Sequence, residues 1–159
     1  MAQQKQIIFH IDVNSAYLSW TALEKLKTGS GVDLRTIPSI IGGDEKSRHG
    51  VVLAKSIPAK KYGIQTGEPV AAALRKCPGL VMEPPDHKRY RRYSRAMIKL
   101  LSEEFSPELE QVSIDECYMD FTSVSHRYAS PEEAAGLIRD RIFESFGFTV
   151  NVGISTVKV

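Results

Sequence analysis

The sequence predicts an α+β fold, in which an antiparallel sheet carries its helices on one face and a small domain is inserted. Three observations lead to this prediction. An apolar run at residues 7–13 is followed directly by a helix-forming segment, and residues 87–155 give the order helix, hairpin, helix and strand. A long mixed excursion, roughly residues 25–85, separates the two parts. Without this excursion the order is βαββαβ, which is typical of split βαβ domains.

The elements of the first half are indicated by apolar runs and by capping residues. Residues 7–13, IIFHIDV, predict a buried strand, in which we expect His10 to be a satisfied core residue rather than a ligand. Asn14 or Ser15 can cap the following helix, and TGSG at residues 28–31 ends it. The excursion then predicts two strands joined by a polar turn (IPSIIGG and GVVLAKS), a short helix near Pro58, a second helix at residues 70–76 and a short strand (LVMEPP).

The second half opens with the strongest helix of the chain, residues 87–105. Tyrosines and aliphatic residues recur on one face of this helix, and charges fill the other. A hairpin follows within residues 110–121, then a helix over residues 131–146 and a final strand, FTVNVGIS. Because the hairpin alternates like a strand, we expect four of its apolar side chains to be buried. These are Val112, Ile114, Met119 and Phe121.

Composition and charge limit the possible classes of protein. The chain has 159 residues, of which 42% are hydrophobic and 25% charged, so we expect a packed core and no general disorder. The net charge of +2 indicates no particular partner, but basic residues gather at 46–61 and 88–95 and acidic ones at 103–120. This segregation suits an acidic centre that binds cations beside basic flanks that bind phosphates, but from charge alone ordinary solvated faces are the favoured interpretation.

Cysteine usage and the N-terminus bear on location. Cys77 and Cys117 are too few for a disulfide framework or a zinc site, which fits a reducing cytoplasm. The first twelve residues lack the pattern of a signal peptide, and no apolar run approaches the roughly 20 residues of a membrane helix. We therefore expect a cytoplasmic protein without a membrane partner.

Three carboxylates are expected at one edge of the sheet. Asp12 ends the first strand, and Asp115 and Glu116 lie at the turn of the hairpin beside it. Three crowded anions repel one another, and a bound divalent cation removes that cost. Oxygen ligands suit Mg²⁺, with the Val13 carbonyl as a further donor and a phosphate ester as the substrate. The residues alone leave a second interpretation open, in which Asp115 and Glu116 form an exposed turn and Asp12 caps a helix.

Five segments resemble the Y-family of translesion DNA polymerases, in its polymerase IV and UmuC-like branch. The segments are IIFHIDVNSAYLS, GVVLAKSIPAKKYGIQTGEPV, YRRYSRAMIKLL, VSIDECYMDFT and TVNVGISTVKV, and they occur in the order and spacing of the family. The resemblance implies a ferredoxin-like palm over residues 1–22 and 86–159. It further implies a small fingers domain over residues 23–85.

The resemblance also implies the residues of the active site. It assigns Asp12, Asp115 and Glu116 as catalytic metal ligands, with the Val13 carbonyl, to two Mg²⁺ ions for which Mn²⁺ can substitute. Tyr17 matches an aromatic steric gate that excludes ribonucleotides. Two lysines, Lys60 and Lys158, match residues that bind the nucleotide triphosphate. In the turn of the fingers, Lys46 and Arg48 are candidates for contact with a DNA strand.

The chain departs from the family pattern near the triphosphate. Ala54 and Ile57 stand where the family often has Thr and Tyr, so two hydroxyl contacts to the triphosphate are in doubt. Ser56 or Lys55 could compensate. The basic segment of residues 87–95 carries interleaved tyrosines, and its spacing favours a solvated helix face over a nucleic-acid surface.

The implied activity is error-prone synthesis opposite damaged template. A DNA-directed DNA polymerase of this type takes part in DNA repair and the DNA damage response, and adds dNTPs to a primer 3′-hydroxyl by two-metal nucleotidyl transfer. Its partners are primer-template DNA and dNTP, with a sliding clamp bound through segments absent here. The family continues beyond residue 159, so we expect an N-terminal fragment with little activity alone.

Two other classes of function stay open. The sequence IGGDEKS nearly spells the signature of diguanylate cyclases, whose chemistry would use Asp44 and Glu45. The domain could also be a polymerase-like binding module without catalysis, for which the changes at Ala54 and Ile57 are the support.

Overall fold

The computed structural model describes residues 5–43 and 50–158 and divides into two compact units. The sheet unit comprises Met1–Asn14 and Arg91–Val159, and the inserted unit comprises Ser15–Tyr90. The boundary predicted after residue 22 falls inside helix α1 (Ala16–Lys27), and this helix lies wholly in the inserted unit. Within the described residues, no helix combines the length and the apolar character that crossing a membrane requires.

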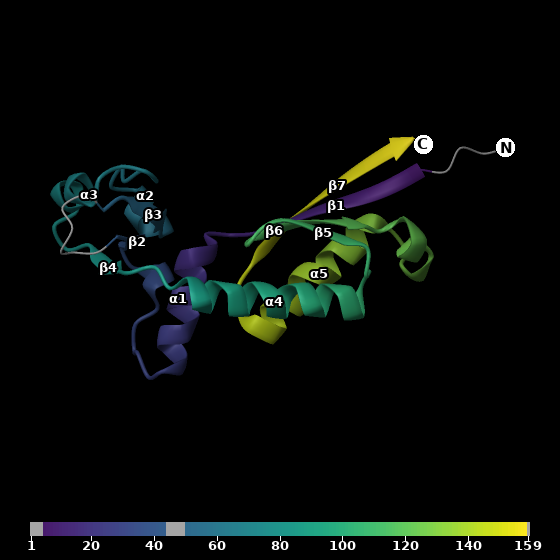
Figure 1. Cartoon of the computed structure of the whole chain (residues 1–159), viewed down its shortest axis with the longest axis horizontal. Helices are drawn as coiled ribbons and strands as arrows, with labels where there is room; N and C mark the ends of the chain where they lie inside the picture. Colours follow the sequence, from purple (N-terminus) through teal and green to yellow (C-terminus); the bar gives the residue numbers. More distant parts are fainter. Residues whose placement is uncertain (1–4, 44–49, 159) are drawn as a thin grey trace. The chain divides into compact units, whose positions relative to one another are not determined.

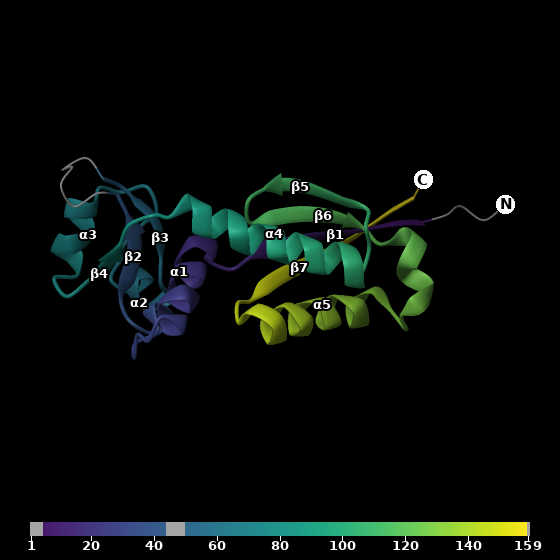
Figure 2. The ribbon, with the colours of Figure 1, turned by 60° about the horizontal axis from the view of Figure 1, so that its bottom comes forward.

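The sheet unit is built on four strands in the order β5-β6-β1-β7, and each neighbouring pair is antiparallel. These strands are β1 (Lys5–Val13), β5 (Leu109–Ser113), β6 (Glu116–Asp120) and β7 (Val150–Lys158). Helices α4 (His87–Glu104) and α5 (Pro131–Phe146) lie on one face of the sheet (Figures 1 and 2). A short 3₁₀ helix, η2 (Thr122–Arg127), links β6 to α5. The predicted α+β fold, with the first strand beside the hairpin, is confirmed.

Alternation along the central strands separates a buried face from an open one. On β1, Phe9, Ile11 and Val13 are buried, whereas the residues between them are only partly buried. The stripe predicted on α4 supplies the opposing side chains, with Met97 and Leu101 fully buried. Burial of apolar side chains on one sheet face provides most of the driving force for this layer. It leaves the even-numbered positions of β1 on the face that the helices do not cover.

Helix α5 begins and ends where the sequence predicts, because both ends are capped. The Ser130 hydroxyl accepts a hydrogen bond from the Glu133 amide at 3.1 Å, and Pro131 occupies the first turn. Gly147 ends the helix with a φ of 89°, a left-handed conformation that favours glycine. Helix α1 differs, since Ser15 at its start has a φ of 44° and makes no side-chain cap, so the predicted cap is wrong.

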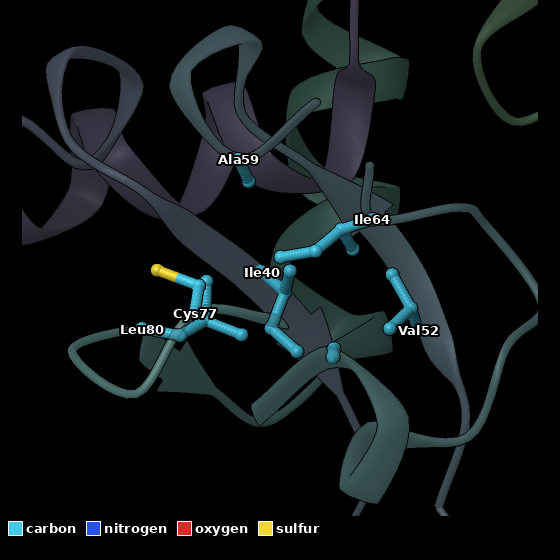
Figure 3. Packing of buried hydrophobic residues seen from close by; sticks show 7 residues of the cluster. Ile40, Val52, Ala59, Ile64, Cys77 and Leu80 are labelled. Carbon is cyan, nitrogen blue, oxygen red and sulfur yellow. The ribbon is translucent and has the colours of Figure 1, made fainter. Parts of the chain in front are cut away.

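The inserted unit has its own small core. Its strands β2 (Ser39–Gly42), β3 (Val52–Lys55) and β4 (Val81–Glu83) form a sheet in the order β3-β2-β4, with β2 and β4 parallel. Short helices η1 (Leu34–Thr36), α2 (Ile57–Lys60) and α3 (Val70–Lys76) complete the unit. Figure 3 shows the buried cluster that holds these elements together. It consists of Ile40, Val52, Ala59, Ile64, Ala73, Cys77 and Leu80.

Two burial predictions on the sheet are wrong. Val112 is 51% exposed, because the register between β5 and β6 shifts between Gln111 and Ser113 and the extra residue turns outward. His10 is a partly exposed residue of the open face and not a core residue, since its position alternates with Phe9 and Ile11. Met119 and Phe121 are fully buried as expected, whereas Ile114, in the connection between β5 and β6, is only partly buried.

Candidate active site

The acidic residues meet where strand β1 ends. Asp12 lies directly opposite Glu116 of β6 in the antiparallel register, and opposite Asn151 of β7 on its other side. Directly opposed residues in such a ladder have Cα atoms about 4.5–5.5 Å apart and share one face. The register therefore places two carboxylate-bearing positions side by side on the open face.

Asp115 is tied to the same end of β1 through the backbone. It is the second residue of the two-residue connection between β5 and β6, and its carbonyl accepts a hydrogen bond from the Val13 amide at 2.9 Å. The Ser113 hydroxyl donates to Asp115 Oδ1 at 2.8 Å and so fixes the side chain. All three predicted acids thus lie within one short stretch of two adjacent strands.

The hairpin turn is unusual in a way that favours this arrangement. Two-residue hairpins normally use turns with positive φ, yet neither Ile114 nor Asp115 has a positive φ. The register shift at Val112 compensates, because a bulge restores the twist that a turn with negative φ would oppose. The acidic pair is therefore carried by a bulged hairpin and not by a glycine turn.

Glu116 has a partner that the sequence reasoning missed. His10 Nε2 lies 3.0 Å from Glu116 Oε2, and both side chains are about one-third exposed, at 37% and 34%. The His10 ring also contacts Tyr118, which is opposite it in register, with the centroids 4.9 Å apart. The signal was available in the sequence, since His10 and Asp12 are two residues apart and so occupy one face of a strand.

Asn14 forms a second missed contact next to the acids. Its side-chain oxygen accepts from Asn151 Nδ2 at 2.7 Å, and its Nδ2 donates to Thr149 Oγ1 at 2.9 Å. These hydrogen bonds join the end of β1 to the start of β7 on the far side from the hairpin. Asn14 therefore fixes the strand end that carries Asp12 instead of capping a helix.

Asp120 of β6 is a fourth acid, in addition to the three predicted ligands, and it has a structural role. Its Oδ1 accepts from the Thr122 amide at 3.0 Å and its Oδ2 from Gln6 Nε2 at 3.2 Å. Hydrogen bonding from Thr122 holds the pKa of this carboxyl below its ordinary value, although burial opposes the shift. The open face thus separates an acid that closes a turn from the acids at the strand end.

The carboxylates adjoin in register, but their side chains are not gathered. Among the described residues, no group of three or more acidic, histidine or cysteine side chains is close enough to hold a metal ion. Glu116 is directed to His10 and Asp115 to Ser113. The oxygen donors match the preference of Mg²⁺ for hard ligands, and Asp12 and Glu116 adjoin in register.

Tyr17 belongs to the inserted unit and is held by other aromatic rings. Its ring stacks on the fully buried Tyr90, with centroids 4.3 Å apart and an interplanar angle of 10°. The His87 ring meets both tyrosines edge-on, at 6.3 Å from Tyr17 and 5.7 Å from Tyr90. The ring predicted to be the gate is therefore fixed by stacking.

The residues around Lys60 include those that differ from the family pattern in the predicted triphosphate-binding segment. Lys60 is an exposed residue at the end of α2, and Ile57 at its start is 72% exposed. The Ser56 hydroxyl accepts from the amides of Ser39 and Ala59 and donates to the Ile37 carbonyl. Because Ser56 is buried and fully engaged, the expectation that it could replace a lost hydroxyl contact is wrong.

Of the remaining predicted residues, the structure places only Lys158, and not beside the acids. Lys158 lies opposite Lys5 at the other end of β1 from Asp12, about 23 Å away along the strand. Lys46, Arg48, Asp44 and Glu45 lie outside the described residues. In the basic segment of α4, Tyr90 and Tyr93 are buried while most of the cations are exposed, so the tyrosines lie on the buried stripe as predicted.

Comparison with known proteins identifies the family. The model of the impB/mucB/samB family matches residues 11–159. The chain belongs to this family. The match covers Asp12, Asp115, Glu116 and the whole inserted unit, and the resemblance to Y-family polymerases is confirmed.

Relatives of this family member are much longer. It is 58% identical to DNA polymerase IV of Clostridium acetobutylicum over 154 residues, which is 97% of the chain and 38% of the relative. It is 36% identical to DNA polymerase IV of Acetivibrio thermocellus over 155 residues, which is 98% of the chain and 37% of that relative. The chain therefore spans little more than a third of the length of these curated relatives.

Solved structures share the fold of this impB/mucB/samB chain. DinB from Sulfolobus solfataricus matches with a TM-score of 0.77 and 24% identity, over 94% of this chain and 42% of that one. An insertion ternary complex of Dbh DNA polymerase matches with a TM-score of 0.77 and 22% identity, over 94% and 42%. At these identities the likeness establishes the fold, and it agrees with the α+β architecture described above.

Proposed function

We propose that this chain forms the catalytic core of a DNA-directed DNA polymerase of the error-prone translesion type. The observation that carries the proposal is the register of Asp12 against Glu116, with the Val13 amide bonded to the Asp115 carbonyl. Membership of the impB/mucB/samB family and the polymerase IV relatives support it. The sheet unit corresponds to the palm, and most of the inserted unit corresponds to the fingers.

The metal ligands in this proposal are Asp12, Asp115 and Glu116, with the Val13 carbonyl. They would hold two Mg²⁺ ions, or Mn²⁺ in their place, which when bound activate the attacking hydroxyl and stabilise the leaving group. Ser113 orients Asp115 through the 2.8 Å hydrogen bond. His10 is the partner of the Glu116 carboxylate when no metal ion is bound. The bulged hairpin keeps the two neighbouring acids at the edge of the sheet.

The proposed reaction is nucleotidyl transfer from a dNTP to a primer on template DNA. The primer 3′-hydroxyl attacks the α-phosphate, a new phosphodiester forms and pyrophosphate leaves. Tyr17, held by Tyr90, excludes a ribose 2′-hydroxyl, and Lys60 neutralises the triphosphate. Lys158 would share that role only if the chain around it takes a different path, since its backbone lies far from Asp12. Both described cysteines are free, in keeping with action in the cytoplasm.

Binding of Mn²⁺ tests the proposal without requiring turnover. Mn²⁺ broadens the NMR signals of nearby amides, so we would record spectra of the labelled 159-residue chain with Mn²⁺, with and without dATP. We expect the broadening to centre on residues 11–13 and 114–117. It should become more closely confined to these residues when dATP is added, and it should be lost in Asp115→Asn. Asp120→Asn is the matched control, because it removes a carboxylate of the same hairpin, one that accepts a hydrogen bond from the Thr122 amide.

The other outcomes identify the alternatives. Selective broadening at residues 43–46 would contradict the polymerase site and favour the cyclase chemistry of Asp44 and Glu45. An absence of selective broadening, even with nucleotide, would contradict metal-dependent chemistry in this chain and favour a binding module. Equal loss of broadening in Asp115→Asn and Asp120→Asn would show that the metal follows net charge and not a defined site.

A further inference from the structure

The sheet unit has a groove whose lining includes none of the proposed metal ligands. It runs between helix α4 and the edge strand β5 and has a volume of about 450 Å³. The helix contributes Arg91, Ser94 and Arg95, and the strand side contributes residues 111–114. Of these residues only Ser113 was assigned a part in the proposed reaction, through its hydrogen bond to Asp115. The groove therefore adjoins the acids without containing any of them, and the rest of its lining has no assigned role.

The two arginines of the groove are uncompensated. Among the residues that the structure describes, neither Arg91 nor Arg95 has an acidic side chain within ion-pair distance. Other arginines of the chain do pair with carboxylates, as Arg35 does with Asp33 and Arg141 with Glu104. Two exposed guanidiniums one helical turn apart, lining one groove, favour an anionic ligand.

The floor and the opposite wall of the groove are already ordered. Ser94 is buried, and its hydroxyl accepts a hydrogen bond from Gln111 Nε2 at 2.9 Å, which joins the helix to the strand. On the strand side the bulge leaves Val112 51% exposed. The groove thus has one cationic wall and one wall that presents an aliphatic side chain. Both walls are formed without a ligand.

The geometry matches an extended peptide. Arg91 and Arg95 are about 6 Å apart along the helix axis. In an extended chain, alternate side chains are about 6.8 Å apart and point to the same side, while those between them point to the other. A strand with acids at alternate positions would therefore meet both arginines, and its intervening aliphatic side chains would meet Val112.

A nucleic-acid strand fits the groove less well. No aromatic residue lines it, so bases have no stacking platform. On the strand side Glu110 precedes the groove and Asp115 follows it, so carboxylates border the positive stretch and would repel a longer polyanion. We propose that the groove between α4 and β5 is a docking site for an extended acidic peptide of a partner protein, with acidic and aliphatic residues in alternation.

A fluorescein-labelled peptide, Gly-Asp-Val-Asp-Val-Gly, tests the proposal by anisotropy against the 159-residue chain. We expect saturable binding that Arg95→Gln weakens at least tenfold, whereas Lys99→Gln, which removes a charge from the same helix outside the groove, changes it less than twofold. Replacing both aspartates of the peptide by asparagine should abolish binding. Amide shifts on adding the peptide should centre on residues 91–95 and 111–114.

Several results would overturn the proposal. These are the absence of binding, equal weakening by Arg95→Gln and Lys99→Gln, and shifts centred elsewhere on the chain. If a hexamer of oligothymidylate bound the same residues more tightly than the peptide, the groove would be a nucleic-acid site and the peptide assignment would be wrong. None of these readouts depends on Mn²⁺ or nucleotide, so this test can fail while the polymerase proposal stands, and the reverse.

Discussion

His10 Nε2 on strand β1 lies 3.0 Å from Glu116 Oε2 on the adjacent strand β6. The contact is diagonal, because the residue directly opposite Glu116 in the ladder is Asp12, two positions after His10. The contact joins an acid proposed to bind metal to a side chain that the sequence places on the same face. In this structure the Glu116 carboxylate is directed to the His10 ring. The histidine therefore acts as an alternative partner for a carboxylate that would otherwise face like charges.

The strength of this contact can be measured by a double-mutant cycle. His10→Ala and Glu116→Ala, singly and together, should give a coupling of about 0.5 kcal/mol in the free energy of unfolding, because both side chains are about one-third exposed and solvent screens the pair. Urea denaturation at pH 7 provides the measurement. A control cycle of His10→Ala with Glu132→Gln, on helix α5, should give no coupling, and equal values for the two cycles would contradict the contact.

Cys117 predicts a loss of stability at alkaline pH. Its side chain is fully buried between β1 and β5, and burial raises the pKa of the thiol from 9.0 to about 11. Between these values the unfolded chain releases the thiol proton while the folded chain retains it, so stability falls as pH rises. The expected loss from this group is about 1.4 kcal/mol at pH 10 relative to pH 8.

A comparison of two chains isolates this effect. Urea unfolding of the wild-type chain and of Cys117→Ala at pH 8 and pH 10 separates the thiol from lysines and tyrosines, which titrate in both. The variant should be less stable at pH 8 because it leaves a cavity, but it should lose less stability on going to pH 10. Parallel losses in the two chains would show that the thiol does not titrate as its burial implies.

The fold was largely predictable because its signals are local. The apolar run of residues 7–13, the stripe on α4 and the caps of α5 each act over a few residues, and each element formed where its pattern predicted. The predicted pairing of the first strand with the hairpin also formed, since βαββαβ order leaves few ways to cover one face.

What the sequence could not predict depends on register and on hydrogen bonds between distant residues. Val112 is exposed because a bulge shifts the register between β5 and β6, and no residue in this segment predicts a bulge. Ser56 is unavailable to a ligand because its hydroxyl bonds Ile37 and Ser39 of a distant segment as well as the Ala59 amide of the helix that it caps. The acids were found from their strand positions, whereas the rotation of Glu116 toward His10 is a side-chain choice that spacing does not determine.

Ser56 gives a direct test of the structure of the inserted unit. Ser56→Ala should lower the free energy of unfolding by about 2 kcal/mol, because it leaves the buried amides of Ser39 and Ala59 and the Ile37 carbonyl without a partner. The control is Ser130→Ala, an exposed cap with one hydrogen bond, for which we expect about 1 kcal/mol. A cost for Ser56→Ala no larger than that of the control would contradict the buried network.

Tyr17 tests the gate in the proposed active site. Its ring is fixed by stacking on Tyr90, so a sugar beneath it would meet a surface that cannot move aside. In titrations of the Mn²⁺-loaded chain, followed by amide broadening, we expect dATP to bind more tightly than ATP. Tyr17→Ala should reduce that preference at least tenfold, mainly by strengthening the binding of ATP, whereas Tyr17→Phe should retain it because the ring remains.

Tyr62→Ala, which removes an exposed tyrosine of the same unit, is the matched control and should leave the preference unchanged. If Tyr17→Ala kept the full preference while its amide spectrum stayed native, the ring would be a structural part of the aromatic cluster, and discrimination against the 2′-hydroxyl would have to come from another residue.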